Sequence, residues 1–256
     1  MEQFTLRQEP RLDSAGWLAF GASDVGHLRD NNEDRFVLVP EAAAYIVCDG
    51  MGGHAGGAEA SYVASEAARD FLTWTGAASA PEDRVREAAQ AAARAVRHAA
   101  DENPALARMG TTLTLTQLDP AAGRAWLGHL GDSRLYRLRA NDLAQITADH
   151  SVAAGMARDG RLDPEEARHS DLWHVLNRAI GAPYNDHADI DSFALDGVAA
   201  IVLCTDGLSN MVPDSAMEEM LRARPGDPRG ACHALIQAAL DAGGDDNVTA
   251  VVLMPA

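Results

Sequence analysis

Short apolar segments recur along the chain, rich in Val, Ile, Leu and Thr and ending at turns with Asp or Gly. Segments of this kind are typical of β-strands. Within the segment 125–138, Gly131-Asp132-Ser133 separates two alternating halves, which predicts a bend or hairpin within one long ladder. The predicted strands cover residues 17–26, 35–40, 43–49, 111–119, 125–138, 199–206 and 247–254.

Helical patterns occur in two well separated pairs. Proline near several of their starts and a Gly-Gly pair after the last one are typical helix boundaries. A further segment, 151–182, is polar, charged and helix-like only in pieces. Because strands cluster while helices come in pairs, the pattern favours an α+β fold of stacked layers over βαβ alternation. No repeat or linker divides the sequence, so we predict a single domain over 1–256. The predicted helices cover 58–75, 82–102, 214–223 and 228–242.

The composition is that of a folded protein with an acidic surface. Of 256 residues, 47% are hydrophobic and 23% charged, enough to bury a sizeable core. The net charge of -17 disfavours a nucleic-acid partner. We find no signal-peptide pattern and no run near the ~18 apolar residues that a membrane helix needs. We therefore expect a soluble, cytoplasmic protein with no membrane partner, and a monomer.

Carboxylates lie beside several of the predicted turns. Asp49 and Asp206 each end an apolar run, where an unpaired carboxylate is costly unless it binds a cation. Asp-Gly and Asp-Asn also make ordinary turns, but five such sites in one chain favour a cation site. Oxygen ligands without a Cys or His cluster favour Mg²⁺ or Mn²⁺, and two such ions are a known route to phosphoester hydrolysis. The sites are Glu33-Asp34, Asp49, Asp132, Asp206 and Asp245-Asp246.

Three rival phosphate-binding chemistries fail on the sequence. A cysteine-dependent phosphatase needs Cys, five residues and then Arg, and none of the three cysteines is followed in this way. A P-loop needs a lysine, which the chain lacks. The loop 50–57 misses the dinucleotide-binding glycine spacing by one residue, and Asp49 would repel a pyrophosphate. Its glycines would instead let the backbone approach metals, with the Gly50 carbonyl free to act as a ligand.

Eight short motifs follow one another in an order that resembles a known family. They are RDNNEDR, VCDGMGGHAGG, MGTTL, LGHLGDSRLY, TADHS, LNRAIG, CTDGLSNMV and DDNVTAVV, from about residue 21 to 253. Together they resemble the metal-dependent protein serine/threonine phosphatases, the protein phosphatase 2C-like family, in its compact bacterial form. The resemblance implies a four-layer αββα sandwich of two antiparallel sheets flanked by helix pairs. Residues 151–182 would form a flap beside the active site.

The resemblance also implies a role for each matching residue. Asp49 would bridge two metal ions, and the Gly50 carbonyl would bind one of them. Asp132, together with Asp206, would hold a third and weaker ion. Arg29 would grip the substrate phosphate, a role that suits a planar bidentate donor. Asp206 and Asp246 would complete the shell of the first ion. Glu33 and Asp34 would hold metal-bound waters.

The histidine of the glycine-rich loop is ambiguous. Animal members carry a histidine directly after Asp-Gly, proposed as the general acid, where this chain has Met51. His54 comes three positions later, as in bacterial members, and either protonates the leaving group or is a loop residue bonded to nearby carboxylates. We expect His169, Trp173 and His174 of the flap to be packing or surface residues.

The leading hypothesis is a phosphatase that opposes a bacterial serine/threonine kinase. A hydroxide bridging two Mn²⁺ or Mg²⁺ ions would attack phosphoserine or phosphothreonine directly, with Asp49, Asp206, Asp246, Arg29 and His54 as the catalytic set. The partners would be phosphorylated proteins, the kinase or its targets. Two alternatives stay open: a non-catalytic phosphoprotein-binding module of the same fold, and a phosphatase of small molecules.

Overall fold

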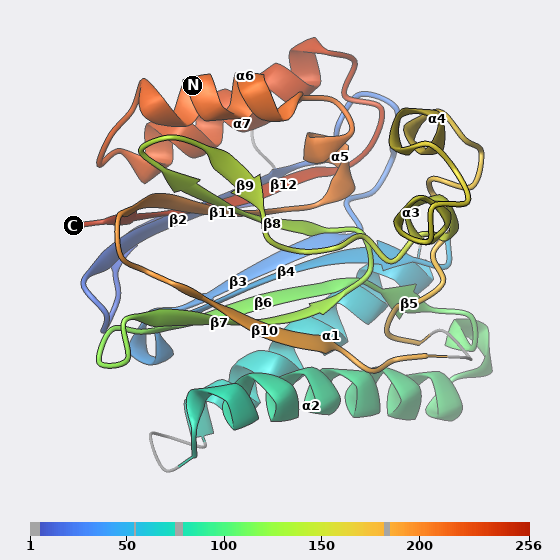
Figure 1. Cartoon of the computed structure of the whole chain (residues 1–256). Helices are drawn as coiled ribbons and strands as arrows, with labels where there is room; N and C mark the ends of the chain where they lie inside the picture. Colours follow the sequence, from blue (N-terminus) through green and yellow to red (C-terminus); the bar gives the residue numbers. More distant parts are fainter. Residues whose placement is uncertain (1–5, 54, 75–78, 182–184) are drawn as a thin grey trace.

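Two antiparallel sheets lie face to face in the centre of the molecule (Figure 1). The computed structural model describes residues 6–53, 55–74, 79–181 and 185–256. The first sheet has the order β1 (Leu6–Leu12), β2 (Trp17–Asp24), β12 (Val248–Pro255), β11 (Val198–Cys204), β8 (Arg134–Arg139), β9 (Leu143–Gln145). The second has the order β10 (Asp189–Ala194), β7 (Arg124–Leu130), β6 (Leu113–Asp119), β4 (Ala44–Met51), β3 (Asp34–Val39), with β5 (Gly110–Thr111) beside β4.

A pair of helices covers the outer face of each sheet (Figure 1). The helix α2 shows why: Ala88, Ala92 and Val96 recur every fourth residue and form a buried stripe. Helices α1 (Ala55–Trp74) and α2 (Pro81–Glu102) pack on the second sheet, and α6 (Asp214–Arg222) and α7 (Pro228–Asp241) lie on the first. The smaller helices are α3 (Val152–Arg158), α4 (Pro164–Arg168), α5 (Asp206–Ser209) and the 3-10 turns Pro40–Ala42 and Pro104–Leu106.

The central strands are continuous apolar runs because both of their faces are buried. In β4, Tyr45 and Val47 face the other sheet, whereas Ile46 and Cys48 face the helices. Strand β11 divides its side chains between the two faces in the same way. Alternation along each strand therefore fills three apolar layers and produces the αββα sandwich that the family resemblance implies.

The structure corrects one predicted element and adds three strands. The turn at Gly131-Asp132-Ser133 is not a hairpin within one ladder, because β7 pairs with β6 and β10 while β8 pairs with β11 and β9. The chain crosses from one sheet to the other at this turn, where Gly131 has φ +103°. The strands β1, β9 and β10 are absent from the sequence-based prediction. None of the helices that the described residues form is both long enough and apolar enough to span a membrane.

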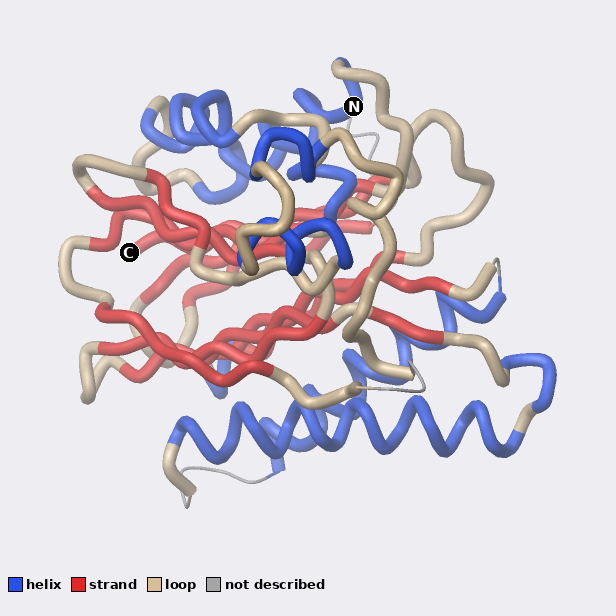
Figure 2. The backbone as a smooth tube through the Cα atoms, turned by 45° about the vertical axis from the view of Figure 1, so that its right-hand side comes forward, coloured by secondary structure: helices blue, strands red, loops and turns tan. Residues whose placement is uncertain are grey.

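Strand register brings the ends of several strands to one end of the sandwich. The last residue of β11, Cys204, pairs with Arg134 at the start of β8 and with Ala250 near the start of β12. In the second sheet, the first residue of β3, Asp34, pairs with Asp49 near the end of β4. The turns that follow or precede these residues carry the carboxylates singled out in the sequence. Figure 2 shows the short helices and loops of the flap region beside the sheets.

Candidate active site

An open cleft of about 750 Å³ lies at this end of the sandwich. Most of the predicted metal ligands line it, together with Thr112 and two residues of the flap. Six carboxylates line the described part of the cleft, whereas Arg29 is the only arginine there. The lining residues used below are Arg29, Glu33, Asp49, Gly50, Thr112, Asp132, His174, Asp206 and Asp246.

Asp49 is fixed by the backbone of the strand pair that carries it. Its N–H donates to the Oγ1 of Thr112 at 2.9 Å, and its carbonyl accepts from the Thr112 N–H at 2.9 Å. The Thr111 hydroxyl donates to the same carbonyl at 3.0 Å. None of these bonds uses the carboxylate, which is left to face the cleft.

Asp34 lies behind the cleft and not among the residues that line it. Its side chain is 4% exposed, and its Oδ2 accepts hydrogen bonds from the hydroxyls of Thr205 at 2.8 Å and Thr249 at 2.7 Å. Thr249 belongs to β12 of the first sheet and Thr205 directly follows β11, so this carboxylate joins the two sheets beneath the site. The structure places Asp34 next to the other carboxylates, but with its Oδ2 already committed to hydrogen bonds.

The clustered carboxylates hold their protons more tightly than isolated ones. Burial raises the pKa of Asp34 to about 7, and the charges of Asp206 and Asp246 add to the effect. Burial and the charge of Asp206 raise the pKa of Asp132 to about 8. The pKa of Asp49 is also well above its usual value, through burial and then the charge of Asp34. A cation bound among these carboxylates would lower all three pKa values again, because its charge favours the ionised form.

In EDTA, we expect the free energy of unfolding to fall as the pH rises from about 6.5 to about 8. Folded Asp34 and Asp132 retain protons there that the unfolded chain, with carboxyl pKa values near 4, has already released. His129, whose pKa burial lowers to about 3, acts in the opposite sense only up to about 6.5. Since Asp132 faces the cleft, the loss should be on the order of 1 to 2 kcal/mol. Urea unfolding at four pH values measures it, and a flat or rising profile would contradict the clustered-carboxylate interpretation.

Arg29 and Asp246 meet at the mouth of the cleft. The guanidinium Nη2 lies 2.7 Å from Asp246 Oδ2, and the two side chains are 53% and 38% exposed. A pair this exposed contributes little to stability. The arginine predicted to bind phosphate therefore contacts a predicted metal ligand directly.

Asn247 and two glycines hold the loop that carries Glu33. The Asn247 Oδ1 accepts from the Glu33 N–H at 2.8 Å, while its Nδ2 donates to the carbonyls of Val25 and Asn31, both at 2.9 Å. A Cβ on Gly57 would lie 1.9 Å from the Glu33 carboxylate, and one on Gly50 would lie 2.1 Å from the Gly57 carbonyl. Only glycine fits at positions 50 and 57, because any side chain there would clash with Glu33 or with the neighbouring backbone.

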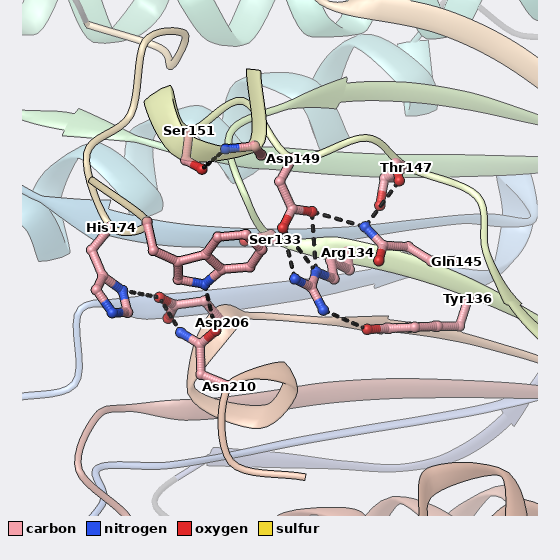
Figure 3. Close-up of polar contacts among 12 residues, drawn as sticks. Ser133, Arg134, Tyr136, Gln145, Thr147, Asp149, Ser151, His174, Asp206 and Asn210 are labelled. Carbon is pink, nitrogen blue, oxygen red and sulfur yellow. Dashed lines mark hydrogen bonds and ion pairs between the residues drawn. The ribbon is translucent and has the colours of Figure 1, made fainter. Parts of the chain in front are cut away.

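The flap brings His174 to the site (Figure 3) and Trp173 beside it, contacts that the sequence does not predict. His174 lines the cleft with its Nδ1 3.9 Å from Asp206 Oδ2, and the contact raises the pKa of the imidazole. The Trp173 Nε1–H donates to Asn210 Oδ1 at 3.2 Å, and Asn210 Nδ2 donates to Asp206 Oδ2 at 3.1 Å. The expectation that these two flap residues only pack or lie on the surface is therefore incomplete. No local sequence pattern signals the contacts of the two flap residues, because 32 positions separate His174 from Asp206 and 37 separate Trp173 from Asn210.

The residues present fit divalent metal ions by charge and by ligand type. Hard carboxylate and carbonyl oxygens line the cleft, and among its described lining residues six carboxylates face the single guanidinium of Arg29. Within the described ranges, however, no three His, Cys, Asp or Glu side chains already stand as a cluster able to hold an ion. Binding would thus draw the carboxylates inward, and would compete with Arg29 for Asp246.

The structure brings together most of the site predicted from the sequence. Arg29, Glu33, Asp49, Gly50, Asp132, Asp206 and Asp246 line one cleft, with Asp34 directly behind them. His54 lies outside the described residues, so its predicted role as general acid stays a prediction.

Comparison with known proteins identifies relatives across nearly the whole chain. The family model for protein phosphatase 2C matches residues 26–235. The serine/threonine phosphatase stp of Listeria welshimeri is 32% identical over 239 residues, which cover 90% of this chain and 93% of that protein. The serine/threonine protein phosphatase PstP of Mycobacterium tuberculosis is 36% identical over 242 residues, 90% of this chain and 43% of that longer protein. The crystal structure of the PstP catalytic domain with 2 manganese ions has a TM-score of 0.81 at 33% identity, covering 93% of this chain and 97% of that one.

The family model covers most of the stretch along which the eight motifs lie. The matches confirm the predicted family, its sandwich fold and an enzyme of the protein serine/threonine phosphatase class. The chain belongs to the protein phosphatase 2C family.

Proposed function

We propose that this protein removes phosphate from phosphoserine and phosphothreonine in other proteins, with two Mn²⁺ or Mg²⁺ ions in the cleft. The observation that carries the proposal is the convergence of six carboxylates with Arg29 in one open cleft. The similar PstP catalytic domain, whose crystal structure is in complex with 2 manganese ions, supports the choice of metal. When bound, the two ions would lower the pKa of a water in the cleft and so supply a hydroxide for direct attack on phosphorus.

Each residue of the cleft has a distinct part in the proposal. Asp49 would bridge the two ions, and the Gly50 carbonyl would complete the site of one of them. Asp132 would hold a third, weaker ion with Asp206. The other residues that would hold ions or their waters are Asp206, Asp246, Glu33 and Asp34.

Arg29 would bind the substrate phosphate from the mouth of the cleft. Its guanidinium already faces the carboxylates and is half exposed, and its planar donors suit two phosphate oxygens at once. Binding phosphate would exchange the exposed contact with Asp246 for a contact with the reacting group. The leaving alkoxide needs a proton, and we propose His54 or a water of the site as its donor.

The setting of the enzyme is also part of the proposal. We propose a single domain that acts as a monomer in the bacterial cytoplasm on phosphorylated proteins, opposing a serine/threonine kinase. The net charge of -17 supports protein over nucleic acid as partner. A cleft open to solvent supports a phosphorylated side chain on a larger molecule as substrate.

Purified protein is expected to hydrolyse a phosphothreonine peptide and p-nitrophenyl phosphate with Mn²⁺ and to lose the activity in EDTA. Asp246→Asn should lower kcat/KM for the peptide by about 100-fold or more, because it weakens the ion site that positions the reaction. Asp245→Asn, one residue away and exposed, is the matched control and should retain activity. Turnover that persists in EDTA, or an unimpaired Asp246→Asn variant, would overturn the metal assignment. Faster hydrolysis of phosphorylated metabolites than of peptides would favour the small-molecule alternative.

A further inference from the structure

His150 lies directly behind the turn that carries Asp132. His150 forms two hydrogen bonds with Gly131. Its backbone N–H donates to the Gly131 carbonyl at 2.8 Å, and its side-chain Nδ1 accepts from the Gly131 N–H at 3.1 Å. The imidazole is 2% exposed and stacks on His129 with ring centroids 4.7 Å apart. The residue next to Asp132 is therefore fixed by a buried side chain from another segment.

The hydrogen bonds define how the imidazole is protonated. Because Nδ1 accepts from the Gly131 N–H, the ring proton of neutral His150 is on Nε2. That proton points to Asp189 Oδ2, 2.9 Å away. The Arg178 guanidinium donates to the other oxygen of Asp189 at 2.7 Å, while its Nη1 lies 2.9 Å from Nε2. The carboxylate of Asp189 thus orients the ring from outside.

This arrangement also joins the two ends of the flap. His150 precedes the first flap residue, and Arg178 lies near the last, and both meet at Asp189 of β10. Nearby, the Asn177 N–H donates to the His150 carbonyl at 2.9 Å, and Ile180 exchanges two backbone hydrogen bonds with Thr111 of β5. The base of the flap and the Gly131–Asp132 turn are parts of one hydrogen-bonded unit.

We propose that His150 is a positioning residue for the weak metal site: through Gly131 it sets the direction in which Asp132 enters the cleft. The inference rests on the proposed function, in which Asp132 holds the third ion. Partners that orient metal ligands from outside the first shell typically change metal affinity by about 10- to 100-fold when removed. Gly131 has no side chain that could fix its own conformation, and a Cβ there would lie 2.5 Å from the Thr112 Cγ2, so the bonds from His150 are what hold its N–H and carbonyl.

The neighbouring His129 provides a matched control. It is as deeply buried as His150 and belongs to the same stacked pair, but its Nδ1 bonds to the hydroxyl of Thr114 and not to Gly131. Replacing either histidine removes a buried ring and costs stability. Only the replacement of His150 also releases the turn that carries Asp132.

The test measures Mn²⁺ binding by titration calorimetry and the exchange rate of the Gly131 amide proton by NMR, in four variants of the full chain. Relative to the parent, His150→Leu is expected to weaken the weakest Mn²⁺ site by about 10-fold and to accelerate Gly131 exchange. His150→Asn, whose side-chain oxygen can replace Nδ1 as acceptor, should restore most of the Mn²⁺ affinity and most of the protection of the Gly131 amide. His129→Asn should leave both unchanged. Asp132→Asn should abolish the weak site without changing Gly131 exchange.

The outcomes separate this proposal from the proposed function. If Asp132→Asn loses the weak site but His150→Leu binds it as tightly as the His129→Asn control, His150 does not position the ligand. If Asp132→Asn binds ions as the parent does, the assignment of Asp132 is wrong, and the role of His150 is overturned with it. If His150→Leu does not fold, the comparison of His150→Asn with Asp189→Ala decides. His150→Asn should keep the Gly131 amide protected from exchange and the weak ion bound, whereas Asp189→Ala should lose both. Equal behaviour of these two variants would overturn the proposal.

Discussion

Asp49→Asn is expected to abolish phosphatase activity while making the metal-free protein more stable. The carboxylate lies among Asp34, Asp206 and Asp132, and burial together with these charges raises its pKa well above the usual value. An amide of the same shape removes one negative charge from this cluster and relieves the repulsion. It also removes the oxygen proposed to bridge the two ions, so kcat/KM should fall by at least about 1,000-fold.

Two measurements on the same variant separate these effects. Thermal unfolding in EDTA at pH 8 should give a higher Tm for Asp49→Asn than for the parent, whereas added Mn²⁺ should raise the Tm of the parent alone. Asp119→Asn is the matched control, because Asp119 ends β6 much as Asp49 lies near the end of β4, but away from the cleft. It should change neither activity nor the response to Mn²⁺. An Asp49→Asn variant that loses stability in EDTA would show that the carboxylate is already compensated.

The elements predicted correctly are those whose pattern is set by burial on both faces. Strands β4 and β11 are continuous apolar runs because each lies between another sheet and a helix pair. The edge strand β10 was missed because only one of its six residues, Phe193, is buried, so its sequence resembles a loop. The turn at Gly131 was misassigned because two strands that follow one another can pair with each other or with different sheets, and alternation alone does not distinguish these cases.

The residues of the site also fall into two groups, those with a signal in the local sequence and those whose role depends on the tertiary fold. The sequence predicts Asp49 and Asp206 as site candidates because a carboxylate after a buried strand is costly on its own, a signal visible locally, and both line the cleft. Asn247 and His174 were not found, because their roles depend on backbone groups and carboxylates brought close only by the tertiary fold. Asp149 was noticed as part of the motif TADHS without a role. The structure gives it one, in a buried ion pair with Arg134.

Asp149→Ala is expected to lower the free energy of unfolding by about 3 to 5 kcal/mol. Arg134 and Asp149 are 10% and 6% exposed, and the guanidinium donates from Nε at 3.0 Å and from Nη2 at 2.7 Å (Figure 3). The remaining polar groups are also paired: Nη1 of Arg134 donates to the Tyr136 hydroxyl, and Gln145 donates to Asp149. Removing the carboxylate alone leaves a buried positive charge and takes away one of the two acceptors of the Gln145 amide, which keeps its bond to the Thr147 carbonyl.

The lower free energy of unfolding should come from the unpaired charge of buried Arg134 and not from the missing Asp149 side chain as such. Arg134→Met with Asp149→Leu removes both charges, and this double variant should be clearly more stable than Asp149→Ala in urea unfolding. Asp142→Ala is the surface control: Asp142 is 53% exposed and lies 3.6 Å from Arg137, so its loss should cost about 0 to 1 kcal/mol. Because the Trp173 ring of the flap lies 5.9 Å from the Arg134 guanidinium, Asp149→Ala should also weaken flap docking and accelerate amide exchange there. A cost no greater than that of Asp142→Ala would mean that water reaches Arg134 and that the pair does not support the flap.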